Sequence, residues 1–457
     1  MRVAAEAVLG ELRRHGHEAY FAGGSVRDLV MERTPHDYDI ATSARPEAVM
    51  ALFPRTVAVG VSFGVVIVLH GGHEFEVATF RADGVYLDGR HPTSVQFSSA
   101  AEDVARRDFT INGLLYDPET QQVIDYVGGQ ADIAARVVRC IGDPRARFGE
   151  DRLRMLRAVR FVVRFGFEME PATWEALREL APAIHEVSAE RIRDELLKML
   201  TGPTPDRALR LLDSCGLLAE VLPEVAAMKG VEQPPGFHPE GDVFEHTARA
   251  LAALEPPTSP VGASGPQGRQ PWETEALWLA TLLHDVGKPL TMTVTDRIRF
   301  HEHERVGADV AEKICRRLRL SDHHVQRTRD LVADHMHCMN VEHMRRAKRI
   351  RFLRQDHLRD LLALHRADRL AGQGDLSQYE FALAQLAELS PEQLRPPRLL
   401  DGHALQEAGV SRGPRLGLLL RELEDAQLGG EVTTRAEAEL WLQRRLARDD
   451  EKKPKES

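Results

Sequence analysis

The chain has 457 residues, of which 43% are hydrophobic and 28% charged, and its formal net charge is −10. This length predicts several domains, and the negative charge excludes a generally basic nucleic-acid-binding surface, so RNA binding would need local basic patches. No apolar run approaches the roughly 20 residues of a membrane span, and the charged N-terminus is not a signal peptide. Four scattered cysteines fit a reducing compartment, so we expect a cytoplasmic protein without membrane association or an obligate protein partner.

Residues 1–20 read as an amphipathic helix, and a double-glycine turn follows it. Gly23 and Gly24 let the backbone come close to a ligand, and the helix start behind them can seat a phosphate. Asp37 and Asp39 alternate along a short strand and therefore point the same way. Two parallel carboxylates repel each other unless a cation such as Mg²⁺ lies between them. Either pattern alone is common, but together they indicate a nucleoside triphosphate and its magnesium ion.

A helix at Pro46–Phe53 and a hairpin of strands at Val57–Leu69 and Phe75–Phe80 are expected next. Glu76, on the returning strand, is a candidate third catalytic carboxylate if this strand lies beside Asp37 and Asp39. A solvated strand face explains Glu76 equally well. Residues 81–105 are rich in turn formers without periodicity, which predicts a long mobile loop beside the site.

The string RRDFTIN, residues 106–112, combines two arginines with Asp108 and Asn112. Arginine suits phosphate oxygens and a carboxylate suits ribose hydroxyls, although a surface ion pair is the simpler interpretation of such a string by itself. A turn-rich strand pair at 123–127 should close an α/β head near residue 140.

From Gly142 onward the sequence is almost entirely helical. Spacings of three and four predict that Glu150, Asp151 and Arg154 share one helix face, either as stabilising surface ion pairs or as a base-reading element. A carboxylate accepts from an exocyclic amino group, and an arginine donates to a ring acceptor. Cytosine and adenine offer that pattern, whereas uracil and guanine offer the reverse, so the pair would select C and A without a template.

The stretch GGSVRDLVMERTPHDYDIAT (residues 23–42) resembles the first motif of the class II tRNA nucleotidyltransferase (CCA-adding enzyme) and bacterial poly(A) polymerase family. RRDFTIN, the segment 142–154 and SAERIRDELLKML (residues 188–200) resemble the following motifs. The resemblance implies addition of nucleotides from CTP and ATP to the 3′ end of tRNA. It also implies Mg²⁺ at Asp37 and Asp39, with Glu76 as a possible third catalytic residue. The implied nucleotide-binding residues are Gly23, Gly24, Arg27, Arg107, Asp108, Asn112, Asp151 and Arg154.

Residues 230–375 hold a set of histidines and aspartates that the nucleotide site does not need. Imidazole and carboxylate ligands suit divalent metals, although any single histidine here would ordinarily be a surface or core residue. The ordered set resembles the HD phosphohydrolase pattern, which implies metal-assisted hydrolysis of a phosphoester, with cyclic phosphates at RNA ends as candidate substrates. The resemblance assigns one metal, of unknown identity, to His246, His284, Asp285 and Asp368, and a second to His303, His335 and the shared Asp285. We expect His301, His323, His324 and His337 to be non-ligands.

The predicted fold is α+β: a polymerase-β-like head with a mixed sheet and helices, followed by an all-helical neck, body, HD domain and tail. The expected divisions are a head at 1–140, a neck and body at 141–228, an HD domain at 229–390, a two-helix tRNA-binding tail at 391–447 and a disordered end at 448–457. The motifs leave two rival functions open. One is an A-adding enzyme or poly(A) polymerase, which shares the head motifs. The other is an RNA-binding HD phosphohydrolase with an inactive head.

Overall fold

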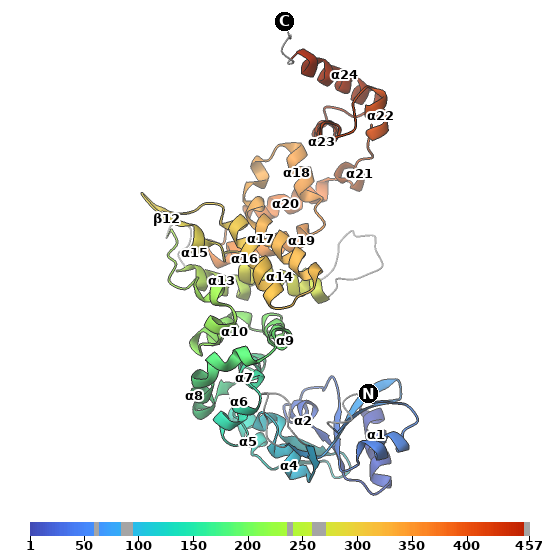
Figure 1. The fold of residues 1–457 in the computed structure, drawn as a ribbon, viewed down its shortest axis with the longest axis vertical. Helices are drawn as coiled ribbons and strands as arrows, with labels where there is room; N and C mark the ends of the chain where they lie inside the picture. The colour runs from blue at the N-terminus through green and yellow to red at the C-terminus, as the bar shows by residue number, and fades with distance from the viewer. Residues whose placement is uncertain (59–63, 84–94, 235–240, 258–270, 452–457) are drawn as a thin grey trace. The chain divides into compact units, whose positions relative to one another are not determined.

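The computed structural model (Figure 1) describes residues 1–58, 64–83, 95–234, 241–257 and 271–451. The chain divides into two compact units. The first contains Met1–Ala227 with Ile314–Leu320, and the second contains Met228–Lys313 with Ser321–Ser457. A mixed sheet with helices lies in the first unit and helices dominate the second, which confirms the predicted α+β fold. The finer division into head, neck, HD domain and tail stays a prediction.

The first unit is built around a seven-stranded sheet with the order β3-β4-β5-β2-β1-β8-β9. Its strands pair antiparallel except β2 and β5, which run parallel with Ile40 opposite Val77. Both of these side chains are buried, so the residues before them, Asp39 and Glu76, point to the opposite face. The strands are β1 (Ala19–Ala22), β2 (Asp39–Thr42), β3 (Thr56–Val57), β4 (Val65–His70), β5 (His73–Thr79), β8 (Leu114–Asp117) and β9 (Gln122–Asp125).

Helices flank this sheet and then continue as a helical layer in the same unit. The amphipathic helix α7 packs against α9 and α10, and β10 (Val137–Val138) pairs with β11 (Glu168–Met169) beside it. The α-helices are α1 (Arg2–Arg14), α2 (Gly24–Val30), α3 (Pro46–Leu52), α4 (Ala100–Ala105), α5 (Gly129–Ala135), α6 (Pro144–Glu150), α7 (Leu153–Phe165), α8 (Pro171–Leu180), α9 (Ala189–Leu200), α10 (Pro205–Ser214), α11 (Leu217–Val221) and α12 (Pro223–Ala226). The 3₁₀ helices are η2 (Thr110–Asn112) and η3 (Ala181–Glu186).

The segment predicted as one long loop, residues 81–105, contains regular structure instead. Strand β6 (Arg81–Asp83) pairs antiparallel with β7 (Val95–Phe97), and α4 follows directly. Ser99 and Glu102 form a capping box that starts α4, a local signal that the absence of periodicity concealed. The intervening part of the predicted loop, residues 84–94, lies outside the described residues.

The second unit is a helical bundle in which α13 packs against α14 and α19, and α14 also packs against α17. Helix α14 is apolar on all sides and buried from Ala276 to Leu283, which makes it the central helix of this bundle. The α-helices are α13 (Val243–Ala253), α14 (Pro271–Leu283), α15 (Lys288–Thr291), α16 (His303–Arg317, which belongs to this unit up to Lys313), α17 (Asp322–Asp334), α18 (Arg346–Leu353), α19 (Leu358–Ala371), α20 (Ser377–Glu388) and α21 (Pro391–Leu394). A 3₁₀ helix, η4 (His335–His343), and a hairpin of β12 (Met292–Val294) and β13 (Ile298–Phe300) complete it.

Three helices, not the predicted two, form the C-terminal part of this unit: α22 (Gly402–Glu407), α23 (Pro414–Gly429) and α24 (Arg435–Glu451). They share an apolar cluster that includes Leu405, Leu419 and Leu442. Helix α24 continues to Glu451, so the end predicted as disordered from residue 448 is helical over its first residues. Residues 452–457 lie outside the described part of the chain. Across the described ranges, no helix has the length and apolar character that crossing a membrane requires.

Candidate nucleotide site and metal centre

A cavity of about 550 Å³ in the first unit gathers most of the residues predicted for the nucleotide site. It is formed by the glycine turn before α2, the start of β2, the segment 106–112, and helices α7 and α9. Its lining is polar and rich in arginine, as a site for an anionic ligand should be. The lining residues are Gly23, Gly24, Arg27, Asp28, His36, Asp37, Asp39, Arg106, Arg107, Asp108, Asn112, Asp151, Leu153, Arg154, Arg157, Arg160, Phe161, Arg164 and Arg191.

The two predicted catalytic aspartates both line this cavity, although only one belongs to a strand. Asp39 is the first residue of β2, whereas Asp37 is exposed and precedes the strand. Tyr38 turns the other way and packs against Phe21, with ring centroids 5.0 Å apart, as alternation requires. Burial, and then the neighbouring carboxylates Glu76 and Asp37, raise the pKa of Asp39 to about 6. A carboxylate destabilised by like charges is the donor that a divalent cation would bind, so these residues fit Mg²⁺.

Glu76 lies on a strand beside Asp39, as its predicted catalytic role requires, but it does not line the cavity. Its strand, β5, pairs directly with β2, and the register places Glu76 next to Asp39 on the same face. However, Glu76 is exposed and is not among the residues that line the cavity. Its contribution therefore reaches the site through charge, and its catalytic role stays a prediction.

The turn needs a glycine at position 23 because there is little room for a Cβ there. Gly23 has φ +66°, and a Cβ at this position would lie 3.1 Å from Nη1 of Arg107 and 4.0 Å from Oδ2 of Asp39. Arg107 donates through Nη2 to Asp103 at 2.9 Å, while its buried Nε has no hydrogen-bond partner among the described residues. A buried cationic donor without a partner is costly. An anionic ligand oxygen would satisfy it.

Arg27 and Asn112 form a buried support at one side of the cavity. Arg27 donates through Nη1 to Oδ1 of Asn112 at 2.7 Å and through Nε and Nη2 to Oδ1 of Asp28 at 2.9 and 2.7 Å. Its guanidinium also lies 4.5 Å from the centroid of the Phe165 ring. Arg27 is thus fixed in place, and Gly24 lies directly beside it: a Cβ there would meet Nη2 at 3.5 Å.

Asp108 is engaged by protein donors on both oxygens. Arg157 donates to Oδ2 through Nε at 2.8 Å and Nη2 at 2.6 Å, and Asn112 and the Phe109 backbone donate to Oδ1 at 3.1 and 2.8 Å. Burial would raise the pKa of Asp108, but Arg157 and these hydrogen bonds lower it. The predicted contact of Asp108 with a ribose would therefore have to share an acceptor with Arg157, a partner that sequence reasoning missed.

The predicted base-reading residues do not share one helix face. Helix α6 ends at Glu150, Asp151 has an extended backbone with φ −149° and ψ 105°, and α7 begins at Leu153. The prediction failed because spacings of three and four have meaning only inside a continuous helix. Glu150 accepts from Arg154 Nη1 at 2.6 Å, and both Asp151 and Arg154 line the cavity.

Asp151 has a partner on a different helix. Arg191 of α9 donates through Nη2 to Oδ2 at 2.7 Å and through Nη1 to Oδ1 at 3.1 Å. No local signal links residues 40 positions apart, and only the packing of α7 against α9 brings them together.

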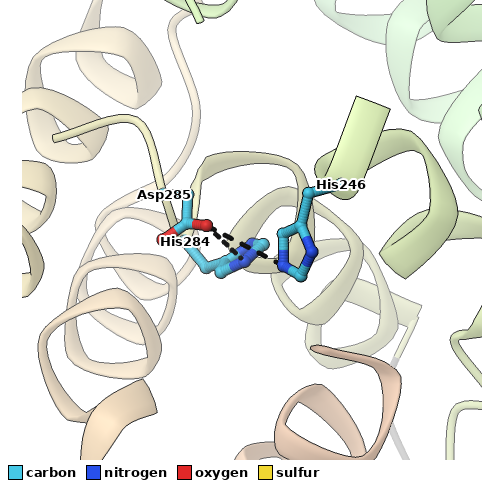
Figure 2. A group of neighbouring side chains, drawn as sticks. All are labelled: His246, His284 and Asp285. Atoms are coloured by element: carbon cyan, nitrogen blue, oxygen red, sulfur yellow. Dashed lines mark ion pairs between the residues drawn. The ribbon is translucent and has the colours of Figure 1, made fainter. Parts of the chain in front are cut away.

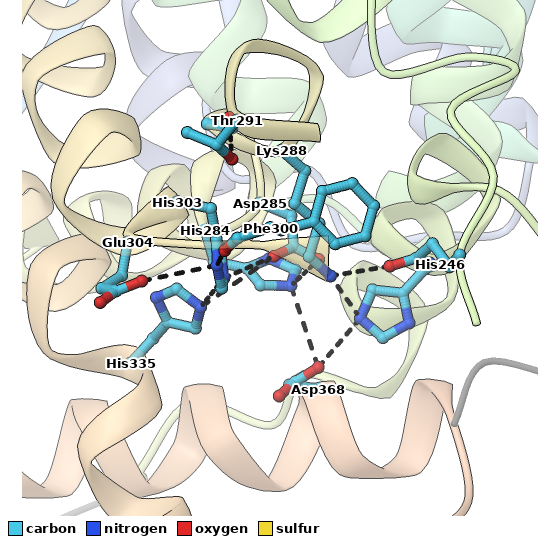
Figure 3. A network of polar contacts seen from close by, with 12 residues as sticks. His246, His284, Asp285, Lys288, Thr291, Phe300, His303, Glu304, His335 and Asp368 are labelled. Carbon is cyan, nitrogen blue, oxygen red and sulfur yellow. Dashed lines mark hydrogen bonds and ion pairs between the residues drawn. The ribbon is translucent and has the colours of Figure 1, made fainter. Parts of the chain in front are cut away.

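In the second unit, the six predicted HD residues converge from helices α13, α16, η4 and α19 and from the turn that follows α14 (Figure 3). The potential ligands form two groups, and within each group the ligand atoms lie within 4.8 Å of one another. Asp285 belongs to both groups, with His246 and His284 in one and with His303 and His335 in the other. Its Oδ2 faces His284 Nε2 at 3.2 Å and His246 Nε2 at 3.9 Å, the group drawn in Figure 2. Its Oδ1 faces His303 Nε2 at 3.5 Å and His335 Nε2 at 4.0 Å. The arrangement can accommodate two cations that share one carboxylate.

Three of these histidines are held in the tautomer that metal binding needs. The Nδ1 atoms of His284, His303 and His335 lie 2.8, 2.9 and 2.7 Å from backbone carbonyl oxygens three residues earlier in the chain. A carbonyl can only accept, so each Nδ1 carries a proton and each Nε2 points to the centre, where a neutral ring would offer a lone pair to a metal. The Nε2 atoms of His303 and His335 face each other at 3.3 Å.

The donor set therefore fits divalent cations. The buried Nε2 of His284 has no hydrogen-bond partner in the described part of the chain. Burial, and then its histidine neighbours, lower the pKa of His335 to about 3, so the ring is neutral and able to bind a metal. Asp368 adds a fourth donor on one side, because its Oδ1 lies 2.9 Å from His246 Nε2 and 3.9 Å from His284 Nε2.

The histidines predicted as non-ligands lie outside both groups. His324 contacts Glu275 at 2.8 Å, His337 contacts Asp334 at 3.3 Å, and His323 lies against the Trp272 ring. Sequence reasoning missed Lys288, whose Nζ donates to Oδ2 of Asp285 at 2.7 Å. The signal was present, because Lys288 follows the His-Asp pair by three residues and starts a helical turn.

Family models match the chain in the predicted order. A poly A polymerase head domain matches residues 19–139, a probable RNA and SrmB-binding site of polymerase A matches 166–229, and an HD domain matches 244–372. The chain is 48% identical to the CCA-adding enzyme of Geobacillus stearothermophilus over 213 residues, which span 46% of this chain and 52% of that protein. It is 33% identical to the CCA-adding enzyme of Streptococcus gordonii over 94% of each chain.

A solved structure agrees over nearly the full length. The crystal structure of the Bacillus stearothermophilus CCA-adding enzyme in complex with CTP matches with a TM-score of 0.73 and 31% identity, and the match covers 98% of each chain. The Thermotoga maritima CCA-adding enzyme complexed with tRNA matches in fold, with a TM-score of 0.60 and 18% identity. The full-length match to the Streptococcus protein, the ordered family models and the 31%-identical structure show that the chain belongs to the CCA-adding enzyme family of nucleotidyltransferases.

Proposed function

We propose that this protein adds CMP, CMP and AMP to the 3′ end of tRNA from CTP and ATP without a nucleic-acid template. The observation that carries the proposal is one arginine-rich cavity that combines an aspartate pair, an arginine with an unpartnered buried Nε among the described residues, and an Asp–Arg pair. The family membership and the CTP complex of the 31%-identical relative support CTP as a substrate.

Asp37 and Asp39 hold Mg²⁺ in this proposal, with Glu76 contributing negative charge from the neighbouring strand. The ion, when bound, lowers the pKa of the terminal 3′-hydroxyl and neutralises charge at the α-phosphate. Gly23 leaves room for the triphosphate, and Arg107 donates to its oxygens. The 3′-oxygen bonds to the α-phosphorus as the bond to the β-phosphate breaks and pyrophosphate leaves, and holding the hydroxyl and the α-phosphate in line lowers the remaining barrier.

Base selection rests on Asp151 and Arg154. Asp151 accepts from the exocyclic amino group of cytosine or adenine, and Arg154 donates to the adjacent ring nitrogen. Glu150 holds the Arg154 guanidinium, since the two side chains are 2.6 Å apart. UTP and GTP are rejected because they present a donor to Arg154 and an acceptor to Asp151, which leaves both protein groups unpaired.

One incubation tests this proposal. Purified protein is mixed with tRNA lacking its 3′ end and with labelled CTP, ATP, UTP and GTP in separate and combined reactions. We expect two CMP additions and then one AMP. Incorporation of AMP alone would indicate an A-adding enzyme or poly(A) polymerase instead, and no incorporation would refute both.

A second activity is favoured by the geometry of the second unit. We propose that the HD centre is a metal-dependent phosphohydrolase, with cyclic phosphates at RNA ends as candidate substrates. Ions bound by His246, His284, Asp285 and Asp368 and by Asp285, His303 and His335 would polarise a phosphoester and activate water. The Nε2 atoms of His303 and His335 support this, because they face each other at 3.3 Å and both lie beside Oδ1 of Asp285, as ligands of one ion would.

Separate substitutions test whether the two activities are independent. Asp39→Ala should abolish nucleotide addition and leave phosphohydrolase activity, and Asp285→Ala should do the reverse, because the two sites use different ligands. Loss of both activities in either variant would contradict the two-site proposal. We also place the protein in the cytoplasm, which is supported by four cysteines that are all free and buried.

A further inference from the structure

Beside the HD centre, Lys288 is bound within the protein in three directions. Its Nζ donates to Oδ2 of Asp285 at 2.7 Å and to Oε1 of Gln233 at 2.7 Å. It also lies 5.4 Å from the centroid of the Phe300 ring. The residue is buried, and a lysine ammonium has three N–H donors. Two of its three donors are thus used within the protein, and Lys288 links Gln233 to the carboxylate shared by the two proposed metal sites.

The orientation of the Gln233 amide follows from this contact. A lysine ammonium can only donate, so Gln233 must present its oxygen to Lys288 and its NH₂ group elsewhere. The side chain is 5% exposed, and its Nε2 has no hydrogen-bond partner in the described ranges of the chain. A buried amide donor without an acceptor destabilises the folded state, so such groups are rare in proteins. Such a group next to a proposed metal centre indicates a contact with a ligand.

We infer that Gln233 is a substrate-contacting residue of the HD centre, where its amide N–H donates to a non-bridging oxygen of the phosphate group. This inference rests on the proposed phosphohydrolase function. Gln233 is two hydrogen bonds away from Asp285, and the positive charge of Lys288 beside it favours an anion. Of the potential ligands, Asp368 has the most exposed side chain, at 20%. No sequence motif identified Gln233, because it precedes the first HD histidine and is 55 residues from Lys288.

A simpler role for Gln233 would be to hold Lys288 in place, and one substitution separates the two roles. Gln233→Glu keeps an oxygen acceptor for Lys288 but removes both N–H donors. Gln233→Leu removes both the acceptor and the donors. Gln326→Glu, at an exposed glutamine in the same unit whose Nε2 donates to Asp330 at 2.8 Å, is the control for the same exchange away from the centre.

The experiment uses the full chain loaded with Mn²⁺ and three measurements on each variant. Mn²⁺ affinity is obtained by calorimetry, the inhibition constant of inorganic phosphate from steady-state kinetics, and kcat and KM from hydrolysis of bis(p-nitrophenyl) phosphate. For both Gln233 variants we expect phosphate binding and KM to weaken about ten- to hundredfold, as for loss of a hydrogen bond to a charged group. Mn²⁺ affinity should stay within about threefold of the parent protein, and Gln326→Glu should change nothing.

Two results would overturn the inference while leaving the phosphohydrolase proposal intact. The first is Gln233→Glu with phosphate binding within about twofold of the parent, which would show that holding Lys288 is the whole role. The second is a parallel loss of Mn²⁺ affinity, which would show that Gln233 acts through Asp285. If the unaltered Mn²⁺-loaded protein neither hydrolyses the diester nor binds phosphate, the phosphohydrolase proposal fails and the inference fails with it.

Discussion

Replacing Arg191 by methionine should relax base selection, although Arg191 itself does not contact the base in the proposed complex. Arg191 and Asp151 form a two-point contact at 2.7 and 3.1 Å, with side chains 23% and 17% exposed. Hydrogen bonds between charged groups contribute about 1.5–3 kcal/mol in partly buried settings. Methionine keeps much of the packing of the arginine stem but leaves the Asp151 carboxylate held only through Oδ1, which accepts from the Leu153 backbone N–H at 3.1 Å, so Oδ2 can turn away from the base.

If orientation of Asp151 accounts for most of that free energy, the preference for CTP over UTP should fall roughly 10- to 150-fold. The assay is single-turnover addition to tRNA lacking its 3′ end, with the ratio of kcat/KM for CTP and UTP as the readout. Arg193→Met on the same helix is the matched control, because Arg193 contacts Asp194 at 2.8 Å and not Asp151. A double-mutant cycle with Asp151→Asn isolates the pairwise term.

The result that would refute this reasoning is a CTP preference in Arg191→Met within about twofold of that of the parent protein. Asp151 would then be held by something other than Arg191. Additive effects of Arg191→Met and Asp151→Asn would refute it equally, since two residues that act through one contact cannot have independent effects.

Three further outcomes can be checked independently. Gly23→Ala should cost about 1–3 kcal/mol of folding stability and strongly reduce kcat/KM for CTP, because a Cβ at φ +66° would press on Arg107. Gly10→Ala, where nothing lies within 4 Å of the added Cβ, is the control. A Gly23→Ala variant with the same urea midpoint as the parent protein would contradict the argument. The Mg²⁺ concentration for half-maximal nucleotide addition should rise as pH falls from about 7.5 to about 5.5. The pKa of Asp39 is raised to about 6, so below that pH a proton competes with the ion for its carboxylate. A half-maximal concentration that does not vary with pH would count against Asp39 as the ligand. Glu195→Gln should lower the free energy of unfolding by about 3–5 kcal/mol in urea titrations, because it leaves the buried Arg160, 2.5 Å away, without its counter-charge. A loss under about 1 kcal/mol would show that the buried ion pair is not stabilising.

The sequence alone identified candidate residues for both sites wherever a prediction depends on neighbours along the chain. Alternation around Tyr38 separated Asp37 and Asp39 from the core, and the paired glycines indicated a close approach to a ligand. The ordered histidines and aspartates resemble the HD pattern, and the structure brings those six residues together. The turn at Gly23 and the alternation around Tyr38 follow from local backbone geometry, whereas the roles assigned to these residues stay predictions.

Tertiary structure decided what those residues touch. It broke the predicted helix at Asp151 and supplied Arg191 from α9 as the partner of that carboxylate. It placed Glu76 beside Asp39 by pairing β5 with β2, and it brought Gln233 to Lys288 and so to Asp285. Contacts between residues tens of positions apart depend on which helix faces pack and on strand register. A single sequence constrains that packing only through burial, and burial does not specify the partner.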